Sequence, residues 1–263
     1  MLIFFTFHIM TPQFCSHFSP EMLKSRISRC TFFSPLYAKI VFSALYILSY
    51  LLLNTYNIYI ANMERPIRLA IFASGNGTNA QQISEHFAGR KDVEVACIVY
   101  NRKDAYVATR AQNLGIESRY FNRSDFMESE RVLEYLREKQ ADYIILAGFL
   151  LLVPENLLKA YPNRIVNIHP ALLPNYGGKG MYGHHVHEAV VANHEPLSGI
   201  TIHVVDQHYD RGTTLFQAKC RLSPEDTADS LAAKIHILEK TYFPKVIESF
   251  VLNKPMPEAK ILD

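Results

Sequence analysis

From Ile67 onward, short apolar runs alternate with segments that carry helical signals. The runs IRLAIFA, VEVACIVY, DYIILAGF and RIVNIH contain few charges, as strands buried on both faces do. A shorter strand is expected near 116–121, and helices are expected over 80–87, 105–114, 125–139 and 154–161. Buried strands separated by helices predict a single α/β domain with a mostly parallel sheet and helices on both faces.

The first 62 residues follow a different pattern. They show neither helix caps nor strand-like alternation, and no charge occurs from Ile40 to Met63. The continuous apolar part, Ile40–Leu53, has a length between that of a signal-type segment and that of a membrane span, so 40–60 is a possible membrane segment. Met63 is followed almost at once by the first strand. We therefore favour an overextended start site, with a hydrophobic extension over 1–62 and the functional domain over 63–263.

The overall charge balance narrows the class of partner. The 263-residue chain has a net charge of +2, and residues 63–263 hold 23 basic and 24 acidic residues. This balance gives no electrostatic case for nucleic-acid binding. The four cysteines are widely spaced, and Cys97 and Cys220 lie in apolar runs, which indicates buried free thiols in a reducing compartment. We expect a cytoplasmic protein that binds small molecules, with a membrane partner only if 40–60 is a genuine span.

A glycine-rich turn follows the first strand. SGNGTN, residues 74–79, joins IRLAIFA to a helix, an arrangement that points backbone N–H groups and a helix N-terminus at an anion. Gly75 and Gly77 allow close backbone approach, while Thr78 and Asn79 add side-chain donors and can cap the helix. The turn also fits a dinucleotide-binding fingerprint, but the second strand lacks the terminal acid that such a site uses for ribose. The turn indicates a phosphate without deciding which one.

Candidate chemistry lies at the carboxyl ends of the predicted strands, where ligands bind in parallel sheets. Asn167 and His169 are two residues apart on one strand and point to the same side. Two such donors suit an oxyanion that forms on a carbonyl, provided that His169 is protonated. Asp210, in the turn HYDRG, is the carboxylate expected to raise the His169 pKa above its reference of about 6.5. A backbone-bonded histidine and an ordinary turn aspartate are the simpler alternatives. We expect these residues to converge with the glycine-rich turn and with residues 148–153.

Four motifs occur along the chain in the order SGNGTN, LAGF, NIHPALLP and HYDRG, the last followed by QAK. Together they closely resemble the phosphoribosylglycinamide (glycinamide ribonucleotide) formyltransferases, which are folate-dependent enzymes of purine biosynthesis. NIHP-x-LLP is shared with the wider formyltransferase superfamily, and the Gly-x-Gly-Thr-Asn turn narrows the likeness to this member. The likeness covers about residues 66–250 and implies a Rossmann-like formyltransferase domain.

The resemblance implies a reaction in de novo purine (IMP) biosynthesis. The amine of phosphoribosylglycinamide attacks the formyl carbon of the co-substrate 10-formyltetrahydrofolate, and no metal is needed. Asn167 and protonated His169 would stabilise the oxyanion, with His169 as general acid and Asp210 raising its pKa. The other site residues implied by the resemblance are Gly77, Thr78, Asn79 and Glu239 for phosphoribosylglycinamide, and Leu150, Leu151, Leu152, Val153 and Asn167 for formyltetrahydrofolate.

The chain departs from the family pattern in two places. Leu151 stands where the family often has a basic residue, so its folate contacts are expected from backbone and packing. The segment NYGGKGMYGHHVH, residues 175–187, looks longer than the compact family version, and its glycines predict a mobile lid. Its histidines are interpreted as solvated loop residues rather than metal ligands, and His203 is interpreted as structural or supporting.

Other functions remain open at this point. Formyltetrahydrofolate deformylases share the Asn, His and Asp, but they usually lack this phosphate turn and carry an N-terminal regulatory domain. Methionyl-tRNA formyltransferases add a basic C-terminal barrel, whereas only about a dozen residues follow the last predicted helix here. A dinucleotide-binding or membrane-tethered regulatory module is the alternative from another class. A monomer or a homodimer is expected.

Overall fold

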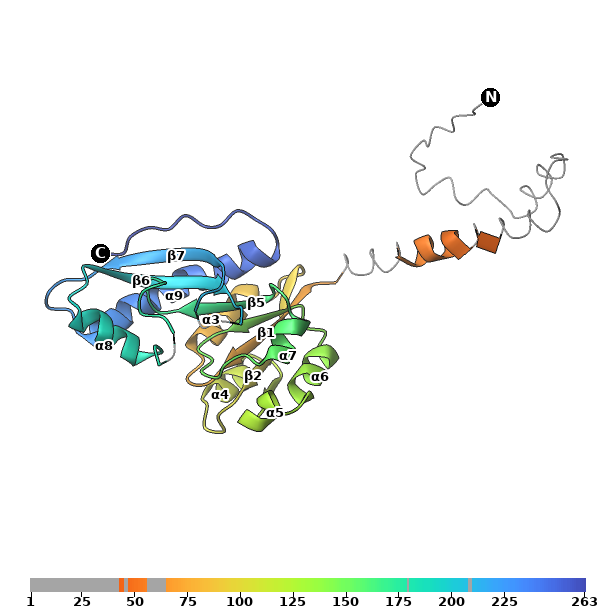
Figure 1. The fold of residues 1–263 in the computed structure, drawn as a ribbon, viewed down its shortest axis with the longest axis horizontal. Helices are drawn as coiled ribbons and strands as arrows, with labels where there is room; N and C mark the ends of the chain where they lie inside the picture. The colour runs from red at the N-terminus through yellow and green to blue at the C-terminus, as the bar shows by residue number, and fades with distance from the viewer. Residues whose placement is uncertain (1–42, 45–46, 56–64, 179, 208–209) are drawn as a thin grey trace, which may run out of the picture. The chain divides into compact units, whose positions relative to one another are not determined.

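The computed structural model describes residues 43–44, 47–55, 65–178, 180–207 and 210–263 (Figure 1). The chain divides into two compact units, Met1–Glu64 and Arg65–Asp263. In the first unit, the described residues 43–44 and 47–55 are helical. No helix formed by the described residues combines the length and the apolar character needed to pass through a bilayer. Part of the candidate membrane segment 40–60 and most of the 1–62 extension lie outside the described residues, so both interpretations stay predictions.

The second unit is built on one seven-stranded sheet with the order β3-β2-β1-β4-β5-β6-β7 (Figure 1). Strands β1 to β5 pair in parallel, whereas β6 pairs antiparallel with both β5 and β7. The strands are β1 (Ile67–Ala73), β2 (Val93–Tyr100), β3 (Ser118–Tyr120), β4 (Tyr143–Leu146), β5 (Ile165–His169), β6 (Leu197–Val204) and β7 (Thr214–Arg221). The chain leaves β1 towards β2 on one side and reaches β4 and β5 on the other, so the topological switch point lies between β1 and β4.

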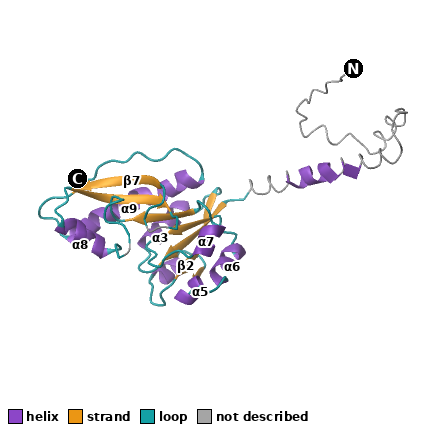
Figure 2. Cartoon of the chain, viewed as in Figure 1, coloured by secondary structure: helices purple, strands orange, loops and turns teal. Residues whose placement is uncertain are grey.

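Helices cover both faces of the sheet (Figure 2). They are α3 (Thr78–Phe87), α4 (Val107–Asn113), α5 (Arg123–Met127), α6 (Arg131–Glu138), α7 (Glu155–Ala160), α8 (His184–Ala192) and α9 (Ala228–Val251). Because side chains alternate along a strand, Leu69 and Ile71 of β1 pack with α3, α4, α8 and α9, while Ala70 and Phe72 pack with α5, α6 and α7. The predicted α/β domain, with a mostly parallel sheet and helices on both faces, is confirmed.

The helix expected over 125–139 is two helices, α5 and α6. Asn122 starts α5 with a capping box in which its side chain and Asp125 exchange hydrogen bonds with the backbone. The Ser129 hydroxyl then donates to the Asp125 carbonyl at 2.8 Å, at the carbonyl that the Ser129 N–H would use in a continuous helix. Because the hydroxyl takes the place of the backbone N–H at this carbonyl, α5 ends here and a second helix, α6, begins at Arg131.

The histidine-rich end of the segment 175–187 is helical rather than a loop. α8 begins at His184, and His187 is buried with 5% of its surface exposed. The interpretation of these histidines as solvated loop residues is therefore wrong for His187, although His184 and His185 are exposed. Val186 and Val190 of the same helix are also buried, because one face of α8 packs into the core.

Cys97 on β2 and Cys220 on β7 are buried free thiols, as the sequence predicts. Burial raises the pKa of Cys97 to about 12 and also raises the pKa of Cys220. Both thiols therefore stay protonated and unreactive near neutral pH.

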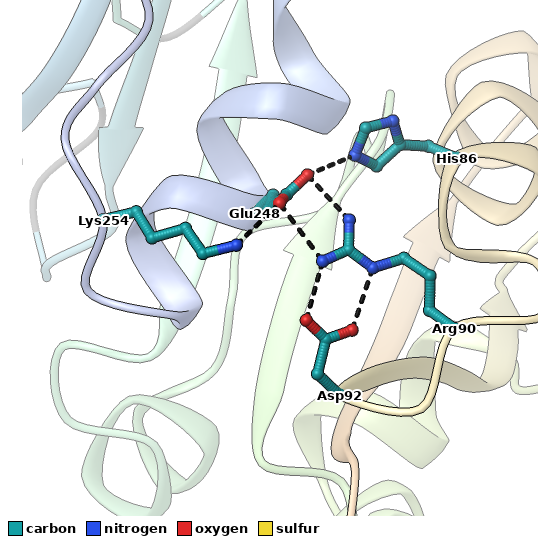
Figure 3. A network of polar contacts seen from close by, with 5 residues as sticks. All are labelled: His86, Arg90, Asp92, Glu248 and Lys254. Carbon is teal, nitrogen blue, oxygen red and sulfur yellow. Dashed lines mark hydrogen bonds and ion pairs between the residues drawn. The ribbon is translucent and has the colours of Figure 1, made fainter.

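A polar network joins α9 to the end of α3 and to the turn beyond it (Figure 3). Glu248 of α9 lies 2.8 Å from an Arg90 nitrogen, 2.8 Å from His86 Nε2 and 3.1 Å from Lys254 Nζ. Arg90 also donates two hydrogen bonds to Asp92, at 2.9 and 2.7 Å. Hydrogen bonds from Arg90, then His86 and Lys254, lower the pKa of Glu248 to about 2. The network holds α3 against α9, the two helices that also contribute to the site below.

Candidate active site

The first wall of the candidate site is the turn between β1 and α3. The N-cap of α3 is Gly77, which has a φ of +77° and no side chain that could occupy the N–H groups of the first turn. Those N–H groups and the positive end of the helix dipole suit a phosphate. The expectation that Thr78 or Asn79 caps the helix is wrong, since Asn79 Nδ2 instead donates to Glu239 Oε2 at 3.0 Å.

The second wall is the loop that follows β4. The Ser74 N–H donates to the Gly148 carbonyl at 3.0 Å, and the Leu150 N–H donates to Ser74 Oγ at 2.8 Å, so this loop is tied to the glycine-rich turn. Leu150 and Leu152 line the site with half-exposed side chains, whereas Val153 is buried. Apolar side chains presented in this way suit a flat or apolar ligand.

Both walls face one cavity of about 530 Å³, a volume suited to small molecules. The residues that the sequence indicated for the site all line it: Gly77, Thr78, Asn79, Leu150, Leu151, Leu152, Val153, Asn167, His169, Asp210 and Glu239. The expected convergence of the glycine-rich turn, residues 148–153 and the end of β5 is therefore confirmed. It occurs because β1, β4 and β5 are parallel neighbours whose carboxyl ends meet at one edge of the sheet.

Asn167 lies on β5 opposite His203 of β6 in the antiparallel register. Asn167 Nδ2 is 3.0 Å from His203 Nε2, and His203 Nδ1 is 3.3 Å from the Val204 carbonyl oxygen. Since a carbonyl only accepts, Nδ1 carries the proton of His203 and Nε2 accepts from the Asn167 amide. His203 thus orients the amide through one N–H and leaves the second N–H for a ligand.

His169 is buried at the end of β5, where both ring nitrogens face polar groups. Its Nε2 donates to the Tyr176 carbonyl at 2.7 Å, and its Nδ1 lies 3.8 Å from Asp210 Oδ2. Asp210 Oδ1 lies 3.7 Å from His203 Nε2, and Asp210 Oδ2 accepts from the Gly178 N–H at 2.8 Å. The Asp210 carboxylate therefore stands between two imidazoles. Residues 208–209 of its turn lie outside the described part of the chain.

The expected upward shift of the His169 pKa is wrong for this arrangement. Burial lowers the pKa of His169, and this outweighs the raising effects of Asp210 and of the hydrogen bond to Tyr176. The physical reason is that desolvation penalises the imidazolium more than a carboxylate 3.8 Å away stabilises it. Burial also lowers the pKa of His203. Both imidazoles are therefore mainly neutral at neutral pH.

Another part of the cavity wall contains a buried carboxylate. Glu239 of α9 is 8% exposed, and its Oε2 accepts from Asn79 and lies 3.0 Å from His236 Nδ1. The contact with Asn79 joins α9 to the first turn of α3. A carboxylate beside a turn whose geometry suits a phosphate would fit a ligand that carries both a cation and a phosphate.

Sequence reasoning missed two histidines of the cavity lining, His187 and His236, and did not find the partner of His203. The contact of His203 with Asn167 depends on the pairing of β5 with β6, which no local pattern shows. For His187 a local signal was present, because Val186 and Val190 have the spacing of a buried helical face. No three His, Cys, Asp or Glu side chains in the described part of the chain are arranged to hold a metal ion.

The chain is similar to known proteins over the second unit. The family profile described as formyl transferase matches residues 67–247. The phosphoribosylglycinamide formyltransferase of Bacillus subtilis is 32% identical over 191 residues, covering 70% of this chain and 94% of that protein. The chloroplastic enzyme of the same name from Arabidopsis thaliana is 39% identical over 186 residues, which cover 68% of this chain and 64% of the relative. The chain thus spans less than two thirds of the Arabidopsis protein.

A solved structure gives the same similarity in three dimensions. The phosphoribosylglycinamide formyltransferase of Streptococcus pneumoniae TIGR4 superposes with a TM-score of 0.63 at 37% identity, covering 70% of this chain and 99% of that one. The similarity includes the sheet and the strand ends around the cavity, because the family profile spans β1 through most of α9.

Proposed function

Because this chain belongs to the formyl transferase family, we propose that it transfers the formyl group of 10-formyltetrahydrofolate to the amine of 5'-phosphoribosylglycinamide. The products are the N-formyl compound and tetrahydrofolate, in de novo purine (IMP) biosynthesis. The observation that carries the proposal is a single cavity that joins the phosphate-binding turn of α3 to Asn167 and His169. We place the reaction in the cytoplasm.

The chemistry of the cavity walls supports the binding roles that we propose. Gly77, Thr78 and Asn79 hold the phosphate at the N-terminus of α3, and Glu239 holds the amine end of the same substrate. The half-exposed leucines of residues 150–153 contact the folate through packing and backbone groups. This division places the two substrates in one cavity, with the formyl carbon between the amine and Asn167.

Formyl transfer forms a bond from the amine nitrogen to the formyl carbon and breaks the bond from that carbon to the folate nitrogen. One proton passes from the attacking nitrogen to the departing one. The free N–H of Asn167 and the imidazole of His169 donate to the oxygen that becomes negative. The negative oxygen and Asp210 together offset the burial that lowers the His169 pKa. His169 therefore takes up the proton that the attacking nitrogen loses and delivers it, as general acid, to the departing folate nitrogen.

His169 Nε2 reaches the formyl oxygen only after it gives up the Tyr176 carbonyl. Tyr176 lies in the segment 175–187, whose glycine-rich part precedes α8. We therefore propose that the part of this segment before His184 acts as a lid, which exchanges the Tyr176 contact for substrate.

The test is formyl transfer by the full chain and by the fragment 63–263, with phosphoribosylglycinamide and 10-formyltetrahydrofolate supplied. Both proteins should form the N-formyl product. His169→Ala should lower kcat/KM by about 10²–10⁴-fold, the usual contribution of a general acid. His185→Ala is the matched control, because His185 is exposed on α8, and it should keep the wild-type rate.

Three results would contradict parts of this proposal. Wild-type activity in His169→Ala would remove the role given to His169. Formate release without the amine acceptor would indicate hydrolysis of the cofactor rather than transfer. A fragment 63–263 that folds but is inactive would show that residues 1–62 take part in function.

A further inference from the structure

His187 is a buried polar residue that the binding roles above do not use. It projects from α8, lines the cavity and has only 5% of its surface exposed. Its Nδ1 is buried without a hydrogen-bond partner among the described residues. An unpartnered nitrogen is costly to bury, and an apolar side chain would fill the same space without that cost. Nδ1 itself is closed off from solvent, so a ligand in the cavity would use the part of the imidazole that lines the wall.

The surroundings of His187 indicate which end of the substrate meets it. Glu239 and His236 of α9, His184 of α8 and His169 of β5 are the titratable groups that act on it. Burial is the main cause that lowers the pKa of His187, and Glu239 opposes it. His187 is therefore neutral at neutral pH, and Glu239 would stabilise any proton that it accepts.

A neutral base is needed at this end of the cavity. An aliphatic amine next to a carbonyl group has a pKa of about 8, so most of it is an ammonium ion at neutral pH. An ammonium ion has no electron pair for attack on a formyl carbon. Glu239 attracts the ammonium form, which improves binding but also holds the proton in place. A second group must take that proton before the bond can form.

We propose that His187 is this group: a base that accepts a proton from the substrate ammonium bound beside Glu239. The inference rests on the proposed function, because it assumes an amine acceptor. An N–H bond of the ammonium breaks, its electron pair stays on the substrate nitrogen, and the proton bonds to the imidazole. This proton is a different one from that carried by His169, which moves only after the amine has attacked.

The test compares His187→Gln with His185→Gln on the exposed side of the same helix. kcat/KM is measured for each from pH 6 to 9.5 with the full chain. His187→Gln should lose roughly 100-fold at pH 6.5, the low end of a base contribution, and the loss should disappear above the pKa of the amine. His185→Gln should follow the wild type throughout. His187→Ala should behave like His187→Gln, with thermal unfolding confirming that each variant folds.

The outcomes separate the two proposals. A loss in His187→Gln that is equal at all pH values would overturn the role as a base, because a packing defect does not depend on the ionisation of the substrate. Unchanged kinetics would overturn it as well. A wild-type chain that forms no N-formyl product would instead overturn the proposed function, and the role of His187 with it.

Discussion

At the scale of single residues, the glycine-rich turn shows how strictly the backbone determines the geometry of the proposed phosphate site. Gly77 adopts a left-handed φ of +77°, and a Cβ at this position would overlap the Val107 side chain and lie 3.0 Å from the Val107 Cα. Gly75, two residues earlier in the same turn, has no atom within 4 Å of the position of a Cβ. The backbone conformation and the contact with Val107 therefore require glycine at position 77, whereas the fold leaves room for a side chain at position 75.

Gly77→Ala should lower the free energy of unfolding by about 1–3 kcal/mol, the usual cost of a strained backbone position. It should also raise KM for phosphoribosylglycinamide, since the first N–H groups of α3 would shift. Chemical denaturation and steady-state kinetics measure the two effects. Gly75→Ala is the matched control for stability and should stay within about 0.5 kcal/mol of the wild type. Equal stability of both variants would contradict the contact with Val107.

At the scale of elements, α3 is joined to α9 near both of its own ends. Asn79 and Glu239 join them at the cavity, and His86, at the end of α3, joins Glu248 of α9 in the polar network (Figure 3). The contact with Asn79 holds Glu239 beside the first turn of α3. A change at Glu248 should therefore act on stability without touching substrate.

Glu248→Gln should destabilise the fold by about 1–3 kcal/mol, because charged hydrogen bonds to Arg90 and Lys254 are lost. The folded-state pKa of about 2 lies below the unfolded value, so this stabilisation is complete above about pH 4.5 and disappears as the pH falls towards 2. Denaturation at pH 7 and pH 3 should show a smaller difference at pH 3. Glu155→Gln, in an exposed pair with Lys159, is the control and should change nothing measurable. A constant difference at both pH values would contradict the network.

At the scale of the whole molecule, the cavity concentrates buried imidazoles. Burial lowers the pKa values of His169, His187 and His203, whereas a hydrogen bond to Glu239 raises that of His236. Among these four described histidines, three have lowered pKa values and one has a raised value, so protonation of the four together favours the unfolded chain.

The free energy of unfolding should therefore decrease as the pH is lowered from about 7.5 to about 5. A histidine with a lowered folded-state pKa binds its proton less readily than the unfolded chain, whose histidines titrate near about 6.5, so stability is lost below that pH. His236 has the opposite effect on stability below the same pH, but it is one group against three. Tm measured by calorimetry should decrease by about 2–4 °C for each kcal/mol lost. His187→Gln removes one of the three groups and should flatten the slope, and a Tm that is constant or higher at pH 5 would contradict this account.

The sequence by itself determined the α/β class, the strand ends and the residues 74–79, 148–153 and 167–169 as parts of one site. These features depend on local apolar periodicity and on turn chemistry, both of which are set by residues close together in the sequence. The sequence pattern did not predict the break between α5 and α6, because the break depends on a hydrogen bond from the single hydroxyl of Ser129. Only the tertiary structure decided the neutral state of His169, the pairing of Asn167 with His203 and the burial of His187. The first and the last depend on which distant segments exclude water from a side chain, and desolvation is a property of the packed chain rather than of any stretch of it. The pairing of Asn167 with His203 depends on the antiparallel register of β5 and β6.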